Sequence, residues 1–382
     1  MHFVSYLKEV NKCVWGGTTQ TIRNRNIDLL KLIAILLICI SHSVPYGIGT
    51  VLTRDSIALI DLGQNTNDMS LMVLAFFRYF GQFGNAIFIV CSAFFLTDSK
   101  CVKVNKILVI ILDSFLISII CGGIVLLFGY SMSISEILKL FFPITTGANW
   151  FISCYVLLYV VHPYLNLLIN NMQKRQYRSL CIGLFALYSM TRLITKDLFY
   201  YNDFIGFVSI YLFTGYYKKY LLDKISIKVA CKVLFLSCIS FAICVVVNNF
   251  IGLRIPAFSN RVMCWLSFIA PFFIITAFSL FHCLYKTKEV FSGPFVTNIA
   301  GLSLIFYLIH ENISFRNYVR ISFFEYMLDS EFTGKYGILC VVLLLFLVQL
   351  TGGLVLANIY NKTFGKITNR LSTGIQKLFN SD

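Results

Sequence analysis

Apolar segments of bilayer-spanning length recur from one end of this 382-residue chain to the other. A transmembrane helix needs about 20 mostly apolar residues, and segments near that length cover 27–47, 80–97, 107–129, 149–169, 179–195, 203–218, 231–251, 262–285, 294–313 and 336–359. Only 13% of the residues are charged, against about 25% in a soluble domain. The sequence therefore predicts an all-α, polytopic transmembrane bundle of about ten spans. The second and sixth segments are short or interrupted, which makes them candidates for tilted or re-entrant helices.

The basic residues are distributed unevenly between the two sides of this predicted bundle. If the N-terminus is internal, most of the 32 lysines and arginines fall in internal segments, whereas carboxylates gather in external ones. Cytoplasmic loops carry such an excess of basic residues, so both termini are predicted to be cytoplasmic. Membrane orientation then explains the net charge of +15 without a nucleic-acid partner. The predicted organisation is a cytoplasmic arm (1–24), a transmembrane domain (25–360) and a basic cytoplasmic tail (361–382).

Two external segments have appreciable length. Residues 48–79 are rich in Asp and Asn, and a short interfacial helix is expected from Ser70 to Phe80; residues 314–335 look similar. The segment 131–148 is predicted to approach the fourth span as an amphipathic stretch. The thirteen cysteines form no CxxC pair and no Cys/His cluster at metal-ligand spacing, so no metal site is expected.

The first span, RNIDLLKLIAILLICISHSVPY over residues 25–46, carries ionisable side chains at both ends. Asp28 and Lys31 lie near its start and His42 near its far end. Because an α-helix turns about 100° and rises about 1.5 Å per residue, His42 is expected within about 20° of Lys31, about 16 Å further along. Lys31 is also explained by snorkelling to the inner headgroups beside Asp28. An imidazole deep in a span needs a hydrogen-bond partner or a functional role, which makes His42 a candidate catalytic residue.

Three lysines, Lys100, Lys103 and Lys106, stand where the third span begins. Lys103 and Lys106 are three residues apart, so they occupy neighbouring positions on one helical face. Positive-inside anchoring is one explanation for them. The other is a clamp for the phosphate groups of a donor that arrives from the cytoplasm.

The second and fourth spans each hold a candidate for substrate contact. Ser92 lies in a Phe-rich segment that also contains Gly81 and Gly84. Small residues in membrane helices usually allow close packing, and no G-x-S-x-G elbow surrounds Ser92 to make it a nucleophile. Trp150 opens the fourth span, where an aromatic girdle at the outer interface is an alternative explanation.

The ninth span ends in SLIFYLIHE, residues 303–311, with His310 and Glu311 at its end. His310 and His42 lie at similar distances along their spans, which convert to about 21–23 Å from the cytoplasmic side. Two histidines at matching depth are expected to line one polar cavity, where either Glu311 orients His310 or His310 polarises the acceptor. A histidine at the membrane interface is the alternative.

The order and spacing of these residues resemble those of the acyltransferase-3 family of bacterial integral-membrane O-acyltransferases. That family opens its first span with Asp-x-x-Arg and places a histidine after ten further residues, much as Asp28, Lys31 and His42 are arranged here. Similar segments elsewhere in the chain are Gly84–Phe94, Trp150–Tyr155 and Tyr307–His310.

The chain departs from the family pattern at three points. Lysine stands for arginine at Lys31, Lys103-x-x-Lys106 stands for Arg-x-x-Arg, and Ala93 stands for glycine. Lysine offers a point charge where arginine offers a bidentate fork. Phosphate contacts are therefore expected to survive with a changed geometry.

The resemblance implies transfer of an acyl group, most often acetyl, from cytoplasmic acyl-CoA to a carbohydrate hydroxyl in a bacterial plasma membrane. The acceptor would be a surface or extracellular polysaccharide or its lipid-linked precursor. His42 would act as general base or as transient acyl carrier. The residues expected to take part are His42, His310 and Glu311 in catalysis, Lys31, Lys103 and Lys106 on the donor phosphates, and Asp28, Ser92 and Trp150 on substrate.

The expected partners are the lipid bilayer and the carbohydrate acceptor, with a glycan-synthesis complex or a homo-oligomer as further possibilities. One alternative function is export or flipping of a polysaccharide or lipid-linked sugar without chemistry, because intramembrane His and Lys also occur in transport pathways. No inverted repeat is evident in the sequence, which disfavours a transporter. A non-catalytic scaffold is a second alternative.

Overall fold

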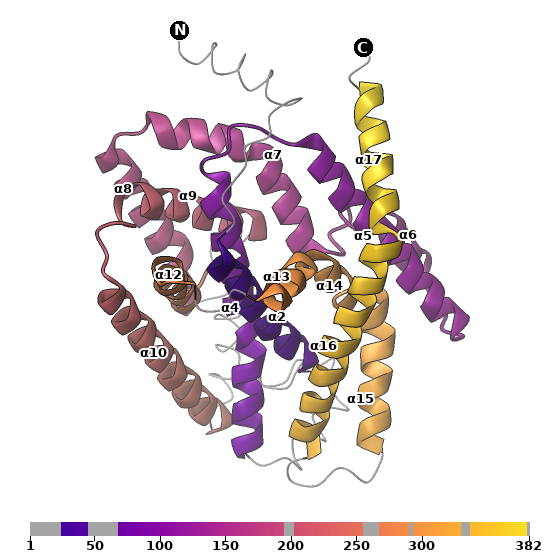
Figure 1. The fold of residues 1–382 in the computed structure, drawn as a ribbon. Coiled ribbons are helices and arrows are strands. Elements are labelled where there is room, and N and C mark those ends of the chain that lie inside the picture. The colour runs from indigo at the N-terminus through magenta and orange to yellow at the C-terminus, as the bar shows by residue number, and fades with distance from the viewer. Residues whose placement is uncertain are drawn as a thin grey trace.

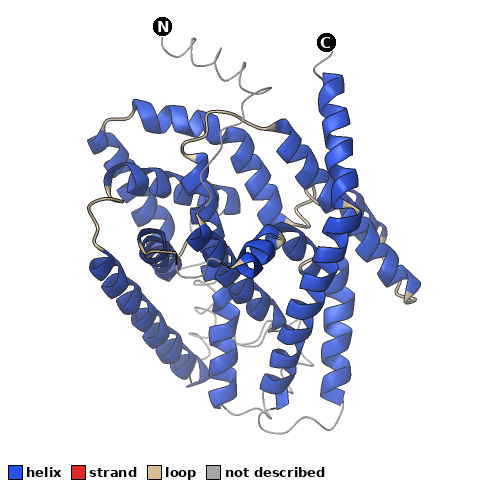
Figure 2. Ribbon diagram, viewed as in Figure 1, coloured by secondary structure: helices blue, strands red, loops and turns tan. Residues whose placement is uncertain are grey.

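The computed structural model describes residues 24–44, 68–194, 202–254, 267–289, 293–329 and 337–379, and these form a bundle of helices with no strand (Figures 1 and 2). The first six helices are α2 (Arg25–Ser43), α4 (Asp68–Leu96), α5 (Val104–Leu127), α6 (Ile134–Phe141), α7 (Trp150–Asn171) and α8 (Lys174–Leu184). The π-helical η2 (Phe185–Ser189) and the 3₁₀ η3 (Met190–Leu193) prolong α8. Next come α9 (Asp203–Tyr220), α10 (Ile227–Arg254), α12 (Pro271–Lys286), α13 (Pro294–Gly301), α14 (Ser303–His310), the π-helical η5 (Phe315–Val319), α15 (Arg320–Asp329), α16 (Gly337–Thr363) and α17 (Gly365–Phe379).

Six described helices are long and apolar enough to cross a membrane: α2, α5, α7 and α16 over their full lengths, residues 72–96 of α4 and residues 227–247 of α10. The chain is therefore a multi-pass, all-α membrane protein, as predicted. Each predicted span overlaps a described helix. The remaining ones are shorter or broken: α12 has 16 residues, and the ninth segment is divided at Leu302 into α13 and α14.

The prediction for residues 70–97 was wrong in one respect. A short interfacial helix from Ser70 to Phe80 and a separate span were expected, but α4 is one continuous helix of 29 residues. Its glycines serve close packing against α2. A Cβ atom at Gly84 would lie 2.7 Å from the carbonyl oxygen of Ala34, and one at Gly81 would lie 2.6 Å from Oγ of Ser41.

Helix α2 runs through the middle of the bundle (Figure 1). It packs along α4 and also contacts α12, α13, α14 and α16. Residues on more than one side of α2 are fully buried, including Leu30, Ala34 and Cys39. Because α2 touches so many elements, side chains on its last turn can meet residues that follow it by more than 250 positions.

The segments predicted to be external are partly helical. In α6, Ser133 and Glu136 form a capping box, in which each side chain accepts a hydrogen bond from the other residue's backbone N–H. The bond from the Ser133 N–H holds the pKa of the Glu136 carboxyl below its usual value. The hydroxyl of Tyr318 in η5 donates to Glu136 at 2.9 Å, which ties η5 to α6.

The C-terminal segment is helical beyond the last predicted span. Helix α16 ends at Thr363, and α17 continues in nearly the same direction (Figure 1) and lies against α5. The hydroxyl of Tyr360, near the end of α16, donates to Oδ1 of Asp113, 2.8 Å away, so the buried carboxylate of α5 is paired. The predicted cytoplasmic arm lies outside the described residues, apart from its last residue, Asn24.

Candidate active site

Helix α2 is fixed at both ends, which determines where His42 lies. At its start the side-chain amide of Asn26 donates to the backbone carbonyl of Thr287, 2.9 Å away. Near its end the hydroxyl of Ser41 donates to the carbonyl oxygen of Arg78 in α4 at 2.6 Å. His42 follows in the last turn, with 21% of its side chain exposed.

His310 and Glu311 lie where α14 ends. The Nδ1 atom of His310 is 3.0 Å from the carbonyl oxygen of Phe306, and the two rings stack with centroids 4.6 Å apart. Glu311 is the C-terminal cap of the helix, and its side chain is only 7% exposed. The chain then turns, because the side-chain oxygen of Asn312 accepts from the backbone N–H of Ser314 at 3.0 Å. This turn directs η5 and α15 back over the end of α14.

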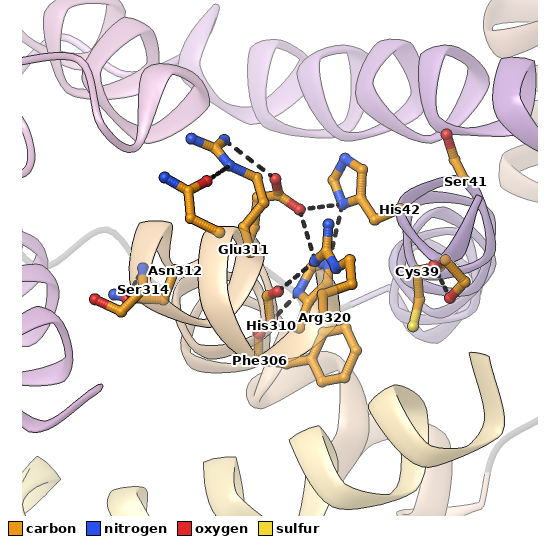
Figure 3. A network of polar contacts seen from close by, with 12 residues as sticks. Cys39, Ser41, His42, Phe306, His310, Glu311, Asn312, Ser314 and Arg320 are labelled. Atoms are coloured by element: carbon orange, nitrogen blue, oxygen red, sulfur yellow. Dashed lines mark hydrogen bonds and ion pairs between the residues drawn. The ribbon is translucent and has the colours of Figure 1, made fainter. Parts of the chain in front are cut away.

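These two helix ends bring His42, His310 and Glu311 together (Figure 3). The Nδ1 atom of His42 lies 2.6 Å from Oε2 of Glu311 and 3.1 Å from Nε2 of His310. A carboxylate and a carbonyl oxygen only accept hydrogen bonds. Nδ1 of His42 is therefore the donor to Glu311, and Nδ1 of His310 donates to Phe306, which leaves Nε2 of a neutral His310 as an acceptor. His42 then carries its lone pair on Nε2, the ring nitrogen that points away from Glu311 (Figure 3).

Two arginines neutralise Glu311, and neither was among the site residues predicted from the sequence. Nη2 of Arg320 lies 2.7 Å from the carbonyl oxygen of His310 and 3.3 Å from Oε2 of Glu311. Nη1 of Arg316 lies 3.4 Å from the other carboxylate oxygen. Both arginines belong to the segment assigned to an external loop. Their spacing of four residues, which places them on one helical face, was the available signal. We call His42, His310, Glu311, Arg316 and Arg320 the histidine cluster.

The ligand atoms of His42, His310 and Glu311 lie within 4.8 Å of one another, a grouping that could hold a metal ion by residue type. The surrounding charge disfavours a cation here. Guanidinium nitrogens already lie 3.3 Å and 3.4 Å from the two oxygens of Glu311, and a metal would have to displace them or share the carboxylate. The cluster suits proton transfer better than metal binding.

The structure gives Glu311 a different partner from the one expected. The sequence suggested that Glu311 orients His310, but the carboxylate contacts His42, while His310 is held by Phe306 and by the ring of His42. The reason is local, because the two side chains of consecutive residues at a helix end point in different directions.

Lys31 and Asp28 lie near the start of α2, the end that was predicted to face the cytoplasm. The Lys31 ammonium is 3.9 Å from Oδ1 of Asp28, and 33% of the lysine side chain is exposed. Asp28 is buried. A half-exposed cation with a loose ion pair can still reach an anionic ligand.

Lys103 and Lys106 lie at the start of α5, beside two tyrosines of α7. The Lys106 ammonium donates to the hydroxyl of Tyr155 at 3.0 Å and lies 4.7 Å from the ring centroid of Tyr159. The hydroxyl of Tyr159 accepts from the backbone N–H of Lys103 at 3.4 Å. Both lysine side chains are exposed. We call Lys31, Lys103 and Lys106 the inner lysines.

Trp150 and Ser92 lie on α7 and α4. The ring of Trp150 stacks on Phe268 with centroids 5.9 Å apart and meets Phe151 edge-on at 5.6 Å, so it is part of an aromatic packing cluster. Ser92 is half-buried on α4. The structure gives neither residue a contact with the histidine cluster among the interactions of the described residues, and their predicted role in substrate contact stays a prediction.

A comparison with protein families decides the class of the protein. The family model described as an acyltransferase domain, that of the acyltransferase-3 family, matches residues 24–358, which cover all the helices of the histidine cluster. The chain belongs to the acyltransferase-3 family. No curated protein and no solved structure matches the chain. Membership of this family, together with the six apolar helices, makes the protein a multi-pass membrane acyltransferase.

Proposed function

We propose that this acyltransferase-3 protein moves an acyl group, with acetyl as the simplest case, from cytoplasmic acyl-CoA to a hydroxyl of a surface polysaccharide or its lipid-linked precursor in the bacterial plasma membrane. One observation carries the proposal: the contact of 2.6 Å between Nδ1 of His42 and the buried carboxylate of Glu311. A carboxylate that holds one ring nitrogen as donor leaves the other as a base, which is the arrangement that activates hydroxyl groups in acyl transfer.

In the proposed reaction, Nε2 of His42 takes the proton of the acceptor hydroxyl. The hydroxyl oxygen then attacks the thioester carbonyl carbon, a C–O bond forms and the C–S bond breaks. The proton on His42 passes to the departing CoA thiolate, which restores the neutral imidazole. Glu311 stabilises the imidazolium between these two steps, while Arg320 holds Glu311 in place.

The inner lysines would bind the donor. CoA carries phosphate groups, and exposed ammonium groups are suited to hold them. The Lys106 side chain is already directed by Tyr155 and Tyr159. The thioester would then extend through the bundle from the cytoplasmic ends of α2 and α5 towards His42.

The test compares the acyl content of surface polysaccharide purified from cells that carry wild-type protein or His42→Gln. General base catalysis contributes about 10²- to 10⁴-fold, so the variant should leave the polymer essentially without acyl groups. His282→Gln is the matched control, since His282 is a buried histidine that bonds Tyr217, at 2.6 Å, outside the cluster. Wild-type acyl content in the His42→Gln strain would refute the catalytic role.

A further inference from the structure

A cavity of about 220 Å³ lies beside His310, between α14, η5, α15 and α16. Its wall is mainly apolar and includes Phe315, Phe323, Leu345 and Val348. We call it the α16 cavity. It does not belong to the hydrogen-bonded network of the histidine cluster, yet it shares a boundary with that network.

The end of the α16 cavity nearest the cluster is polar. His310 and Arg320 both line it. Gln349 of α16 is also among the residues that line the cavity, and its side-chain oxygen is buried without a hydrogen-bond partner among the described residues. A buried amide oxygen without a donor is costly, so a ligand that brings an N–H group to this point would be stabilised.

We propose that the α16 cavity receives the acyl group of the donor thioester and so determines which acyl groups the protein transfers. The inference rests on the proposed function and goes beyond it by defining the acyl class. The thioester carbonyl would lie near His310, the acyl chain would lie along the apolar wall, and the amide N–H of the pantetheine arm would reach Gln349.

Chemistry favours this occupant over the carbohydrate acceptor. A sugar would bring several hydroxyl groups against side chains that form no hydrogen bonds, which is unfavourable, whereas an acyl chain needs none. Size indicates the length of the chain. An apolar cavity of about 150 Å³ holds a six-carbon ring such as benzene, and the α16 cavity is larger. An acetyl group would leave most of it unfilled, so longer acyl groups should bind better.

Two adjacent glycines of α16 provide a way to change the cavity. A Cβ atom at Gly353 would lie 2.7 Å from Cε2 of Phe306, so substitution there would disturb the packing of α14. A Cβ atom at Gly352 would meet nothing within 4 Å, although Gly352 lines the cavity. A larger side chain at Gly352 can therefore enter open space without a clash.

The experiment measures the affinity of the purified full-length protein, in detergent, for acetyl-, butyryl-, hexanoyl- and octanoyl-CoA. For wild-type protein the affinity should rise with chain length by about threefold to fourfold per buried methylene and level off when the cavity is full. Gly352→Leu should remove this rise while the affinity for acetyl-CoA stays within about twofold of the wild-type value. Gly123→Leu is the matched control, because Gly123 of α5 also has nothing within 4 Å of its would-be Cβ and does not line the cavity.

Each outcome decides the matter. Equal affinity of wild-type protein for all four thioesters, as expected if a membrane lipid fills the cavity, overturns the inference. So does a chain-length dependence that Gly352→Leu leaves unchanged. Failure of every acyl-CoA to bind would instead count against the proposed function as a whole, which separates the two conclusions. A length dependence lost in Gly352→Leu and kept in Gly123→Leu supports the inference.

Discussion

The histidine cluster and the inner lysines differ in how completely the folded chain assembles them. In the histidine cluster, side chains from α2, α14, η5 and α15 bond one another, and Glu311 is only 7% exposed. The inner lysines are exposed or half-exposed: Lys31 of α2 makes a loose ion pair with Asp28, and Lys106 of α5 donates a single hydrogen bond, to Tyr155 of α7. The groups proposed for chemistry are thus held rigidly before substrate arrives, whereas the groups proposed for donor binding are left free to adjust to a flexible ligand.

The largest effect is expected from Glu311→Gln, which removes the carboxylate that His42, Arg316 and Arg320 of the histidine cluster contact. The amide removes the negative charge that orients His42 and leaves two partly buried guanidinium groups without their carboxylate partner. We expect kcat to fall by about 10³- to 10⁴-fold, as when a histidine loses the carboxylate that sets its tautomer, with the KM for acyl-CoA changed little. Steady-state kinetics in detergent provide both values. Glu136→Gln, in the capping box of α6, is the control and should retain normal kcat.

Arg320→Lys tests whether the cluster depends on geometry as well as on charge. Lysine keeps the positive charge but cannot bond the carbonyl oxygen of His310 and the carboxylate of Glu311 as the planar fork does. Loss of one charge-assisted hydrogen bond corresponds to about 10- to 100-fold, expected in kcat and not in KM. Arg316→Lys should cost less, because Arg316 is 25% exposed against 12% for Arg320 and makes the longer contact. Equal losses in the two variants would show that only net charge matters.

Lys106→Gln tests the proposed role of the inner lysines in donor binding. Removing one exposed phosphate contact should raise the KM for acyl-CoA by about tenfold, the lower end for a hydrogen bond to a charged group, and leave kcat within about twofold. Added salt should weaken donor binding to wild-type protein more than to the variant, since exposed charges are screened. Lys228→Gln is the control, as Lys228 is an exposed lysine on α10. A fall in kcat without a change in KM would assign Lys106 to the chemical step.

The same contrast explains what the sequence predicted about the site. Regular spacing in a helix converts directly into depth, so His42 and His310 could be placed at similar heights, and the structure brings them to 3.1 Å. Arg320 could not be placed in this way. Its position depends on the turn after Glu311, and the local pattern of the segment favoured an external loop. Contacts made after a chain reversal depend on tertiary packing, which a single sequence does not state.

Apolar composition predicted most of the membrane-spanning helices but not the full length of α4. Apolar composition identified α2, α5, α7 and α16, because a span must be apolar wherever it packs. It did not show that α4 runs unbroken from Asp68, since a separate interfacial helix was expected from Ser70 to Phe80. Gly81 was correctly expected to allow close approach, and the structure shows that it does so inside an unbroken helix against Ser41.

The smallest effect is expected from Tyr155→Phe, which tests whether Lys106 depends on Tyr155 for its position. The substitution removes the hydroxyl that accepts from Lys106 at 3.0 Å but keeps an aromatic ring beside the ammonium, and the Tyr159 ring remains 4.7 Å away. An exposed neutral acceptor contributes about 1 kcal/mol at most, so the KM for acyl-CoA should rise by about twofold to fivefold with kcat unchanged. Tyr130→Phe is the control. It removes a hydroxyl that donates to Ser322 at 2.8 Å, and Tyr130 follows the end of α5 opposite to Lys106. If Tyr155→Phe matched the tenfold effect expected of Lys106→Gln, the lysine would depend on its tyrosine for its position, and the donor site would be as preorganised as the histidine cluster.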